Sequence, residues 1–112
     1  MSNLASTVII DPDGESILSS EVAHDQRHNL HVSVDRDNGD VYLGFSSREA
    51  LYDFAKSLLH EAVFGWGDRK EFYPLIVEGK ELVVDGARLT NGSSRVFVSY
   101  SSPIRDVADR EA

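Results

Sequence analysis

Three histidines and an aspartate, all potential metal ligands, fall within eight residues of the sequence: His24, Asp25, His28 and His31. Imidazole nitrogens at such spacing can bind Zn²⁺ or Ni²⁺. Successive side chains of a strand point to opposite faces, so the rings of His28 and His31 would diverge, and His24 could meet His28 only if residues 23–28 were helical. We therefore expect hydrogen-bonded or solvated histidines here, with no metal and no cofactor.

An acidic run, DRDNGD over residues 35–40, resembles the start of a calcium-binding loop. That loop requires glycine at its sixth position and a bidentate glutamate at its twelfth. Here Gly39 stands at the fifth position and Ser46 at the twelfth. A β-hairpin turn explains the same residues better, and we expect no calcium site.

The sequence holds no motif that would assemble a catalytic centre. It has no cysteine, and therefore no thiolate nucleophile, thiolate zinc site or disulfide. There is no Gly-x-Ser-x-Gly sequence, and Gly65-x-Gly67 follows an expected helix, whereas a phosphate-binding loop would open one. His60 is expected on the solvent side of that helix. We therefore expect a protein that is not an enzyme.

Two aromatic residues could instead serve in recognition. Trp66 is the single tryptophan and lies between two glycines. We expect it to fill the core beneath this connection; alternatively it is exposed as an interface anchor, with Asp68 and Glu71 as its polar rim. Tyr42, on the polar face of the expected hairpin, is a second candidate anchor.

The element that positions Tyr42 is a hairpin expected within residues 28–46. A two-residue type I′ turn at Asn38-Gly39 would place Val34 opposite Leu43. The apolar side chains then share one face and point to the core. These are Leu30, Val32, Val34, Val41, Leu43 and Phe45.

A long amphipathic helix is expected next, over about residues 47–64. Ser46 and Glu49 have the spacing of a capping box, and Gly65 ends the helical pattern. One stripe should pack on a sheet and the other should face water. The apolar stripe is Ala50, Leu51, Phe54, Ala55, Leu58, Leu59 and Ala62, and the polar one is Arg48, Glu49, Asp53, Lys56, Ser57, His60 and Glu61.

The remaining strands are predicted from alternation and turn residues. The first pair is residues 7–10 and 16–22, around the turn 11–14. The second pair is residues 72–77 and 81–84, around a type II′ turn at Gly79-Lys80, and a bulge or a second turn follows at Asp85-Gly86. The third pair is residues 88–90 and 95–100, around the turn 91–94. We expect an α+β fold in the order ββ-ββ-α-ββ-β. It would be one antiparallel sheet of about six or seven strands, in a single domain over residues 1–100, with a frayed tail over residues 101–112.

Composition limits the possible partners. The 112 residues carry a net charge of −8, and a balance of −6 falls within the first 46. Nucleic acids and anionic membranes require clustered lysine and arginine, so neither is an expected partner. No apolar run could span a bilayer and residues 1–6 lack a secretory signal, so we expect a soluble cytoplasmic protein. Such a charge would steer encounters with a basic partner.

Three stretches carry a resemblance to a known class of proteins. They are VYLGFSSREALYDFAKSLLHEAVFG (41–65), FYPLIVEGKELVVDGARL (72–89) and SSRVFVSY (93–100). In size, acidity and element order, residues 28–100 resemble the small acidic immunity proteins of bacterial polymorphic-toxin and contact-dependent growth inhibition systems. The resemblance implies a non-catalytic inhibitor that binds a cognate toxin, often a nuclease with a basic active site.

We therefore expect a monomeric inhibitor with two candidate partner-binding surfaces, a first choice and a second. The first is Asp35, Asp37, Asp40 and Tyr42, and the second is Trp66, Asp68 and Glu71. Their carboxylates would pair with the toxin's lysine and arginine side chains around the aromatic anchors. One alternative is an accessory domain that associates with itself or a larger complex through a strand edge. A metal-dependent enzyme built on His24, His28 and His31 is another.

Overall fold

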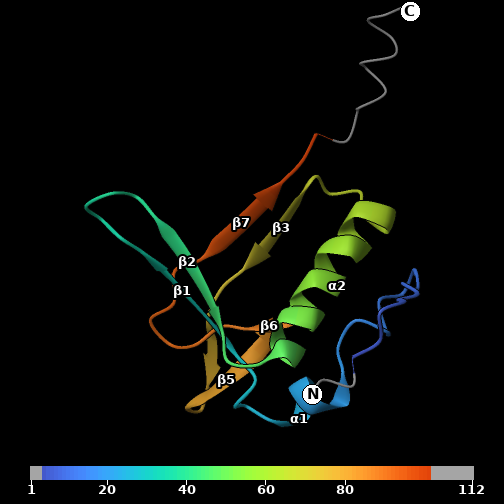
Figure 1. Cartoon of the computed structure of the whole chain (residues 1–112), viewed down its shortest axis with the longest axis horizontal. Coiled ribbons are helices and arrows are strands. Elements are labelled where there is room, and N and C mark those ends of the chain that lie inside the picture. The colour runs from blue at the N-terminus through green and yellow to red at the C-terminus, as the bar shows by residue number, and fades with distance from the viewer. Residues whose placement is uncertain (1–3, 102–112) are drawn as a thin grey trace, which may run out of the picture.

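Two helices and seven short strands make up the described part of the chain, residues 4–101 of a computed structural model (Figure 1). They are α1 (Ser20–His24), β1 (Leu30–Val34), β2 (Val41–Phe45), α2 (Arg48–Phe64), β3 (Arg69–Phe72), β4 (Leu75–Val77), β5 (Lys80–Val84), β6 (Ala87–Arg88) and β7 (Val96–Ser99). The α+β class is confirmed. Apart from Ser101, the predicted tail lies outside the described residues.

The strands form three small antiparallel sheets, so the prediction of one continuous sheet is wrong. β1 pairs with β2, β3 pairs with β7, and β4, β5 and β6 form the third sheet. The predicted strand over residues 72–77 is interrupted at Tyr73-Pro74, because proline cannot donate a ladder hydrogen bond. Two-residue turns at Glu78-Gly79 and Asp85-Gly86, all with positive φ, then fold the third sheet back on itself. The first of these is therefore a type I′ turn and not the predicted type II′ turn.

The hairpin of β1 and β2 is confirmed, but its register differs from the prediction. Val34 opposes Val41, two residues from the predicted Leu43, and residues 36–39 form a wider loop. The Asp37 amide donates to Asp35 Oδ1 (2.8 Å) and the Gly39 amide donates to the Asp35 carbonyl (2.7 Å), which closes this loop. Because the shift is an even number of residues, the same side chains still share one face.

Helix α2 is also confirmed, with its cap one residue later than predicted. Ser47 Oγ accepts the Ala50 amide (3.1 Å), whereas Ser46 Oγ accepts the Asn29 amide (2.7 Å) and ties the helix start to β1. Gly65 ends the helix as expected, with its amide donating to the Glu61 carbonyl (2.8 Å).

The two predicted stripes of α2 are partly wrong. Asp53 and Ser57 are fully buried, and Leu51 and Leu59 are exposed. Asp53 is buried because its Oδ2 accepts both the amide (2.9 Å) and the hydroxyl (3.0 Å) of Ser19, the N-cap of α1.

The N-terminal strands predicted over residues 7–10 and 16–22 are absent from the described chain. The turn between them is present, with the Gly14 amide donating to the Asp11 carbonyl (3.0 Å). Beyond this turn the chain is attached to α2 by the hydrogen bonds between Ser19 and Asp53, and it then enters α1. These side-chain hydrogen bonds stand in place of the backbone hydrogen bonds that paired strands would have made. Strand pairing in the last part of the described chain also differs from the prediction, since residues 88–90 do not pair with β7.

Residues 89–94 instead lie along the outer edge of β1. Leu89 forms a parallel bridge with Leu30, and the Thr90 and Ser94 amides donate to the carbonyls of Leu30 (3.0 Å) and Val32 (2.8 Å).

The hydrophobic core lies beside this edge, where the Phe54 ring contacts Phe45 and Phe72. Its buried members are Leu30, Val32, Phe54, Phe72, Ala87 and Leu89. Beyond this core, the loop end of the hairpin projects away from α2, whose C-terminal half lies along β3 and β7 (Figure 1).

Candidate functional site

The loop end of the hairpin brings the first predicted group of residues together. Asp35 and Asp40 face each other across the strand ends, with the Asp35 amide donating to the Asp40 carbonyl (2.8 Å). The Tyr42 hydroxyl lies 3.5 Å from Asp40 Oδ2. Asp37, Asp40 and Tyr42 are exposed, whereas Asp35 is half-buried because its side chain closes the loop. We call residues 35–40 the acidic loop.

Apolar side chains continue from the acidic loop along one face of the hairpin. Val34, Val41 and Leu43, here called the distal strip, are each about half exposed, and Val41 reaches 57%. They share this face with Leu30 and Val32, which are buried at the base of the hairpin. The expectation that the distal strip points into the core is therefore wrong, because the hairpin is longer than the core that covers it.

The distal strip and Tyr42 lie on opposite faces of the hairpin. Tyr42 opposes Ser33, whereas its neighbours Val41 and Leu43 oppose Val34 and Val32 on the other face. The hairpin end thus carries apolar side chains on one face, an exposed tyrosine on the other, and carboxylates at its tip.

The second predicted group lies in the connection that follows α2 and in β3, across the molecule from the acidic loop (Figure 1). Trp66 is 90% exposed, so the prediction that it fills the core is wrong and the alternative of an exposed side chain is correct. Asp68 is exposed with a positive φ of 63°, whereas Glu71 on β3 pairs with Arg95. Of the predicted polar rim, Glu71 is thus engaged by an arginine of the same chain.

An arginine and aromatic ladder occupies the outer face of β3 and β7 instead. The Arg95 guanidinium lies over the rings of Tyr73 (5.5 Å) and Phe97 (5.3 Å), and Arg69 lies over Phe97 (5.8 Å). The predicted carboxylate of Glu71 is therefore paired with an arginine on this face. The pairing of β3 with β7, which brings Arg95 to Glu71, is a long-range contact that no local pattern predicts.

The histidine group is dispersed over different elements. His28 Nδ1 lies 2.6 Å from Ser47 Oγ, and His31 Nδ1 lies 2.5 Å from Thr90 Oγ1. Asp25 is paired with Arg27, whose hydrogen bonds hold the pKa of Asp25 well below its usual range. Within residues 4–101, no group of three histidine or carboxylate side chains is arranged to hold a metal ion.

Arg88 is a buried cation that sequence reasoning missed. Its guanidinium donates to five backbone carbonyls at 2.8–3.4 Å: those of Glu81, Val22, Asp25, His28 and Ala23. Burial lowers the pKa of Arg88, which marks the cost of removing this charge from water. Since all its partners are backbone carbonyls, its role is to hold α1 and the following turn against β5 and β6.

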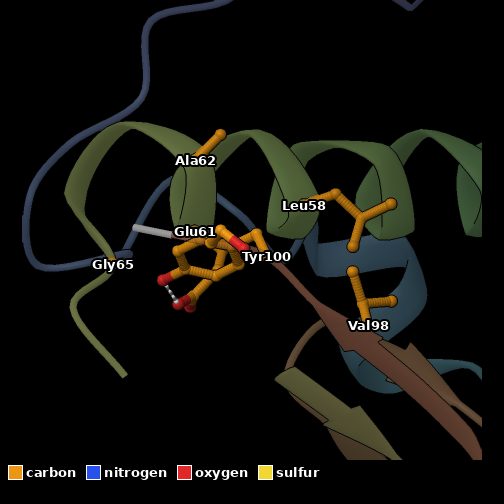
Figure 2. Close-up of a pocket in the computed structure, with 7 residues that line it drawn as sticks. Leu58, Glu61, Ala62, Gly65, Val98 and Tyr100 are labelled. Carbon is orange, nitrogen blue, oxygen red and sulfur yellow. Dashed lines mark hydrogen bonds between the residues drawn. The ribbon is translucent and has the colours of Figure 1, made fainter. Parts of the chain in front are cut away.

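A cavity of about 500 Å³ opens between the C-terminal half of α2 and the end of β7 (Figure 2). In Figure 2, Leu58 points from α2 toward Val98, and Glu61 meets Tyr100 at the other side of the opening. The Tyr100 hydroxyl donates to Glu61 Oε2 (2.6 Å) and accepts the Asp68 amide (3.2 Å). Sequence reasoning missed this pair, because Glu61 was assigned to solvent and Tyr100 to a strand end.

Neither of the two described helices is long and apolar enough to cross a membrane. Comparison of the chain with protein-family models, with curated proteins and with solved structures found no match.

Proposed function

We propose that this chain is a non-catalytic inhibitor that inserts the loop end of its β1–β2 hairpin into the active-site cleft of a basic toxin enzyme. One observation carries the proposal: the projecting hairpin end combines exposed apolar side chains with carboxylates at its tip. Protein interfaces typically have an apolar centre and a polar rim. An apolar patch that a monomer leaves exposed marks a site of interaction.

The placement of the side chains favours insertion into a cleft over docking on a flat surface. Val41 and Leu43 lie on one face and Tyr42 on the other, so a flat partner would cover only one of these groups. A cleft would contact both faces and would receive Asp37 and Asp40 at its floor. There the carboxylates would form charge-assisted hydrogen bonds with the lysine and arginine side chains that bind phosphate in a nuclease.

Asp35 has a different role in this mechanism. Its side chain accepts the Asp37 amide and its carbonyl accepts the Gly39 amide, so it shapes the acidic loop from within. The net charge of −8 would add long-range steering toward a basic partner, and this contribution would weaken with salt.

The test is binding to, and inhibition of, the protein encoded by the neighbouring gene. Asp37→Lys combined with Asp40→Lys should weaken affinity by at least about a hundredfold, since each buried charge-assisted contact contributes about 1.5–3 kcal/mol. The matched control is Asp11→Lys combined with Glu15→Lys, two exposed acids outside the hairpin. It changes the net charge equally and should alter only the salt-dependent part. Equal affinities for the two double variants would refute the proposed surface.

A second candidate, self-association through a strand edge, is favoured by the small size of the sheets. β7 pairs with β3 alone in the described chain. Pairing through backbone groups would be nearly insensitive to salt, so the molecular mass in solution at low and high salt separates this function from that of a monomeric inhibitor.

A further inference from the structure

The cavity beneath the end of α2 has one polar end and apolar walls. Its volume of about 500 Å³ is in the range that receives small ligands. Leu58 of α2 and Val98 of β7 point toward each other and form the apolar end, Ala62 also lines the cavity, and Glu61 and Tyr100 form the polar end (Figure 2). No lysine or arginine is among its described lining residues.

The polar end is held in place by several contacts. The Tyr100 hydroxyl is fixed between Glu61 Oε2 and the Asp68 amide, and the Tyr100 amide donates to the Asp68 carbonyl (3.0 Å). The hydrogen bond to Glu61 raises the pKa of Tyr100, so the Tyr100 hydroxyl keeps the proton that it donates to the carboxylate. A carboxylate held beside apolar walls attracts a cation that carries its own apolar stem.

Gly65 provides the space in which this pair sits. A Cβ atom at this position would collide with the carboxylate of Glu61 and with its backbone carbonyl. The φ of Gly65 is −70°, a value open to any residue. Space, and not backbone conformation, therefore requires glycine here.

We propose that this cavity binds a primary ammonium group on an aliphatic stem, the chemistry shared by alkylamines and the lysine side chain. The stem would lie against Leu58 and Val98, and the ammonium would donate to Glu61 and to the Tyr100 oxygen. An ammonium fits better than a guanidinium. A planar guanidinium binds best when it donates to both oxygens of a carboxylate, and Glu61 Oε2 already accepts the Tyr100 hydroxyl. The inference is independent of the hairpin surface.

The test is an NMR titration of the full chain with n-butylammonium, with butyrate and 1-butanol as probes of equal stem length. Butylammonium should shift the resonances of Leu58, Val98 and the Tyr100 ring. Butyrate should not, and 1-butanol should bind at least about tenfold more weakly, because it lacks the charge-assisted contact. Equal binding of butyrate or butanol would overturn the proposal, as would the absence of shifts with butylammonium.

Two variants test the assignment of the polar end. Glu61→Gln should weaken butylammonium binding at least about tenfold, and Tyr100→Phe should weaken it less, since it removes a neutral acceptor. Glu49→Gln, in the first turn of the same helix and outside the cavity lining, is the matched control and should bind as the parent does. Unchanged binding by Glu61→Gln would refute the site. A parallel titration with N-acetyl-lysine methylamide identifies the source: affinity equal to or above that of butylammonium indicates a lysine side chain, and lower affinity indicates a free amine.

Discussion

Replacing Arg88 provides the most demanding test of how the described chain is held together. The side chain is 4% exposed and donates to five carbonyls from residues 22–28 and 81. Hydrogen bonds from a charged group contribute about 1.5–3 kcal/mol each, so five of them would equal the whole net stability of a small domain, about 5–15 kcal/mol. Desolvation of the cation, seen in the lowered pKa of Arg88, must offset most of that sum.

The net loss for Arg88→Ala should therefore be about 3–5 kcal/mol, the usual cost of removing one member of a buried charged network. In urea unfolding, with a slope of about 1–1.5 kcal/mol per molar, the midpoint should fall by roughly 2–5 M. Arg88→Lys should recover only part of this, because a single ammonium cannot reach carbonyls on three segments. Arg27→Ala, which removes an exposed pair with Asp25, is the control and should change stability by less than about 1 kcal/mol. An Arg88→Ala protein within about 1 kcal/mol of the parent would show that these carbonyls find other donors and that the buried cation is dispensable.

Three further predictions follow from other contacts. Gly65→Ala should lower the unfolding free energy by about 1–3 kcal/mol, because the added Cβ meets the Glu61 carbonyl and carboxylate; a change below about 0.5 kcal/mol in urea unfolding would contradict this. Asp25 has a lowered pKa in the folded chain, so its stabilising contribution is present above about pH 4, the unfolded value, and is lost as pH falls further. Thermal unfolding between pH 2 and 6 should show a smaller acid-side loss for Asp25→Asn than for the parent, and identical pH profiles would exclude the pair with Arg27 as a contributor. Val41→Thr should leave stability within about 0.5 kcal/mol, because the side chain is 57% exposed, while weakening partner binding; a marked stability loss would mean that the distal strip is covered in solution.

The elements that depend on contacts near in sequence were predicted well. The alternation from Leu30 to Phe45 and the helical spacing from Ala50 to Ala62 each identified their element within a residue or two. The register of the hairpin was wrong, because Asp35 closes a four-residue loop by side-chain bonding that competes with a tight Asn-Gly turn. The local sequence pattern indicates which side chains share a face of the hairpin. The hydrogen bonding within the turn decides which residues of the two strands lie opposite each other.

Long-range contacts account for what could not be predicted. The burial of Asp53 depends on Ser19, and the exposure of the distal strip depends on where the core ends; neither is encoded near the residues concerned. The four residues proposed for the hairpin surface do lie together, because they follow one another in the chain. In the Trp66 group the carboxylate of Glu71 is already paired, because Glu71 belongs to a strand whose partner brings Arg95.

The attachment of residues 89–94 to the edge of β1 has a consequence for the order of folding. Leu30 and Leu89 form their bridge although all of α2 lies between them in the sequence. The Val32 amide likewise donates to Ser93 Oγ, and these two residues are 61 positions apart in the chain. The hairpin and α2 can form from contacts near in sequence, whereas this edge must wait for a long loop to close. Removing the Ser93 hydroxyl with Ser93→Ala should therefore accelerate unfolding and leave the folding rate nearly unchanged. That result would mean that residues 89–94 attach to the edge of β1 after the rate-limiting step of folding.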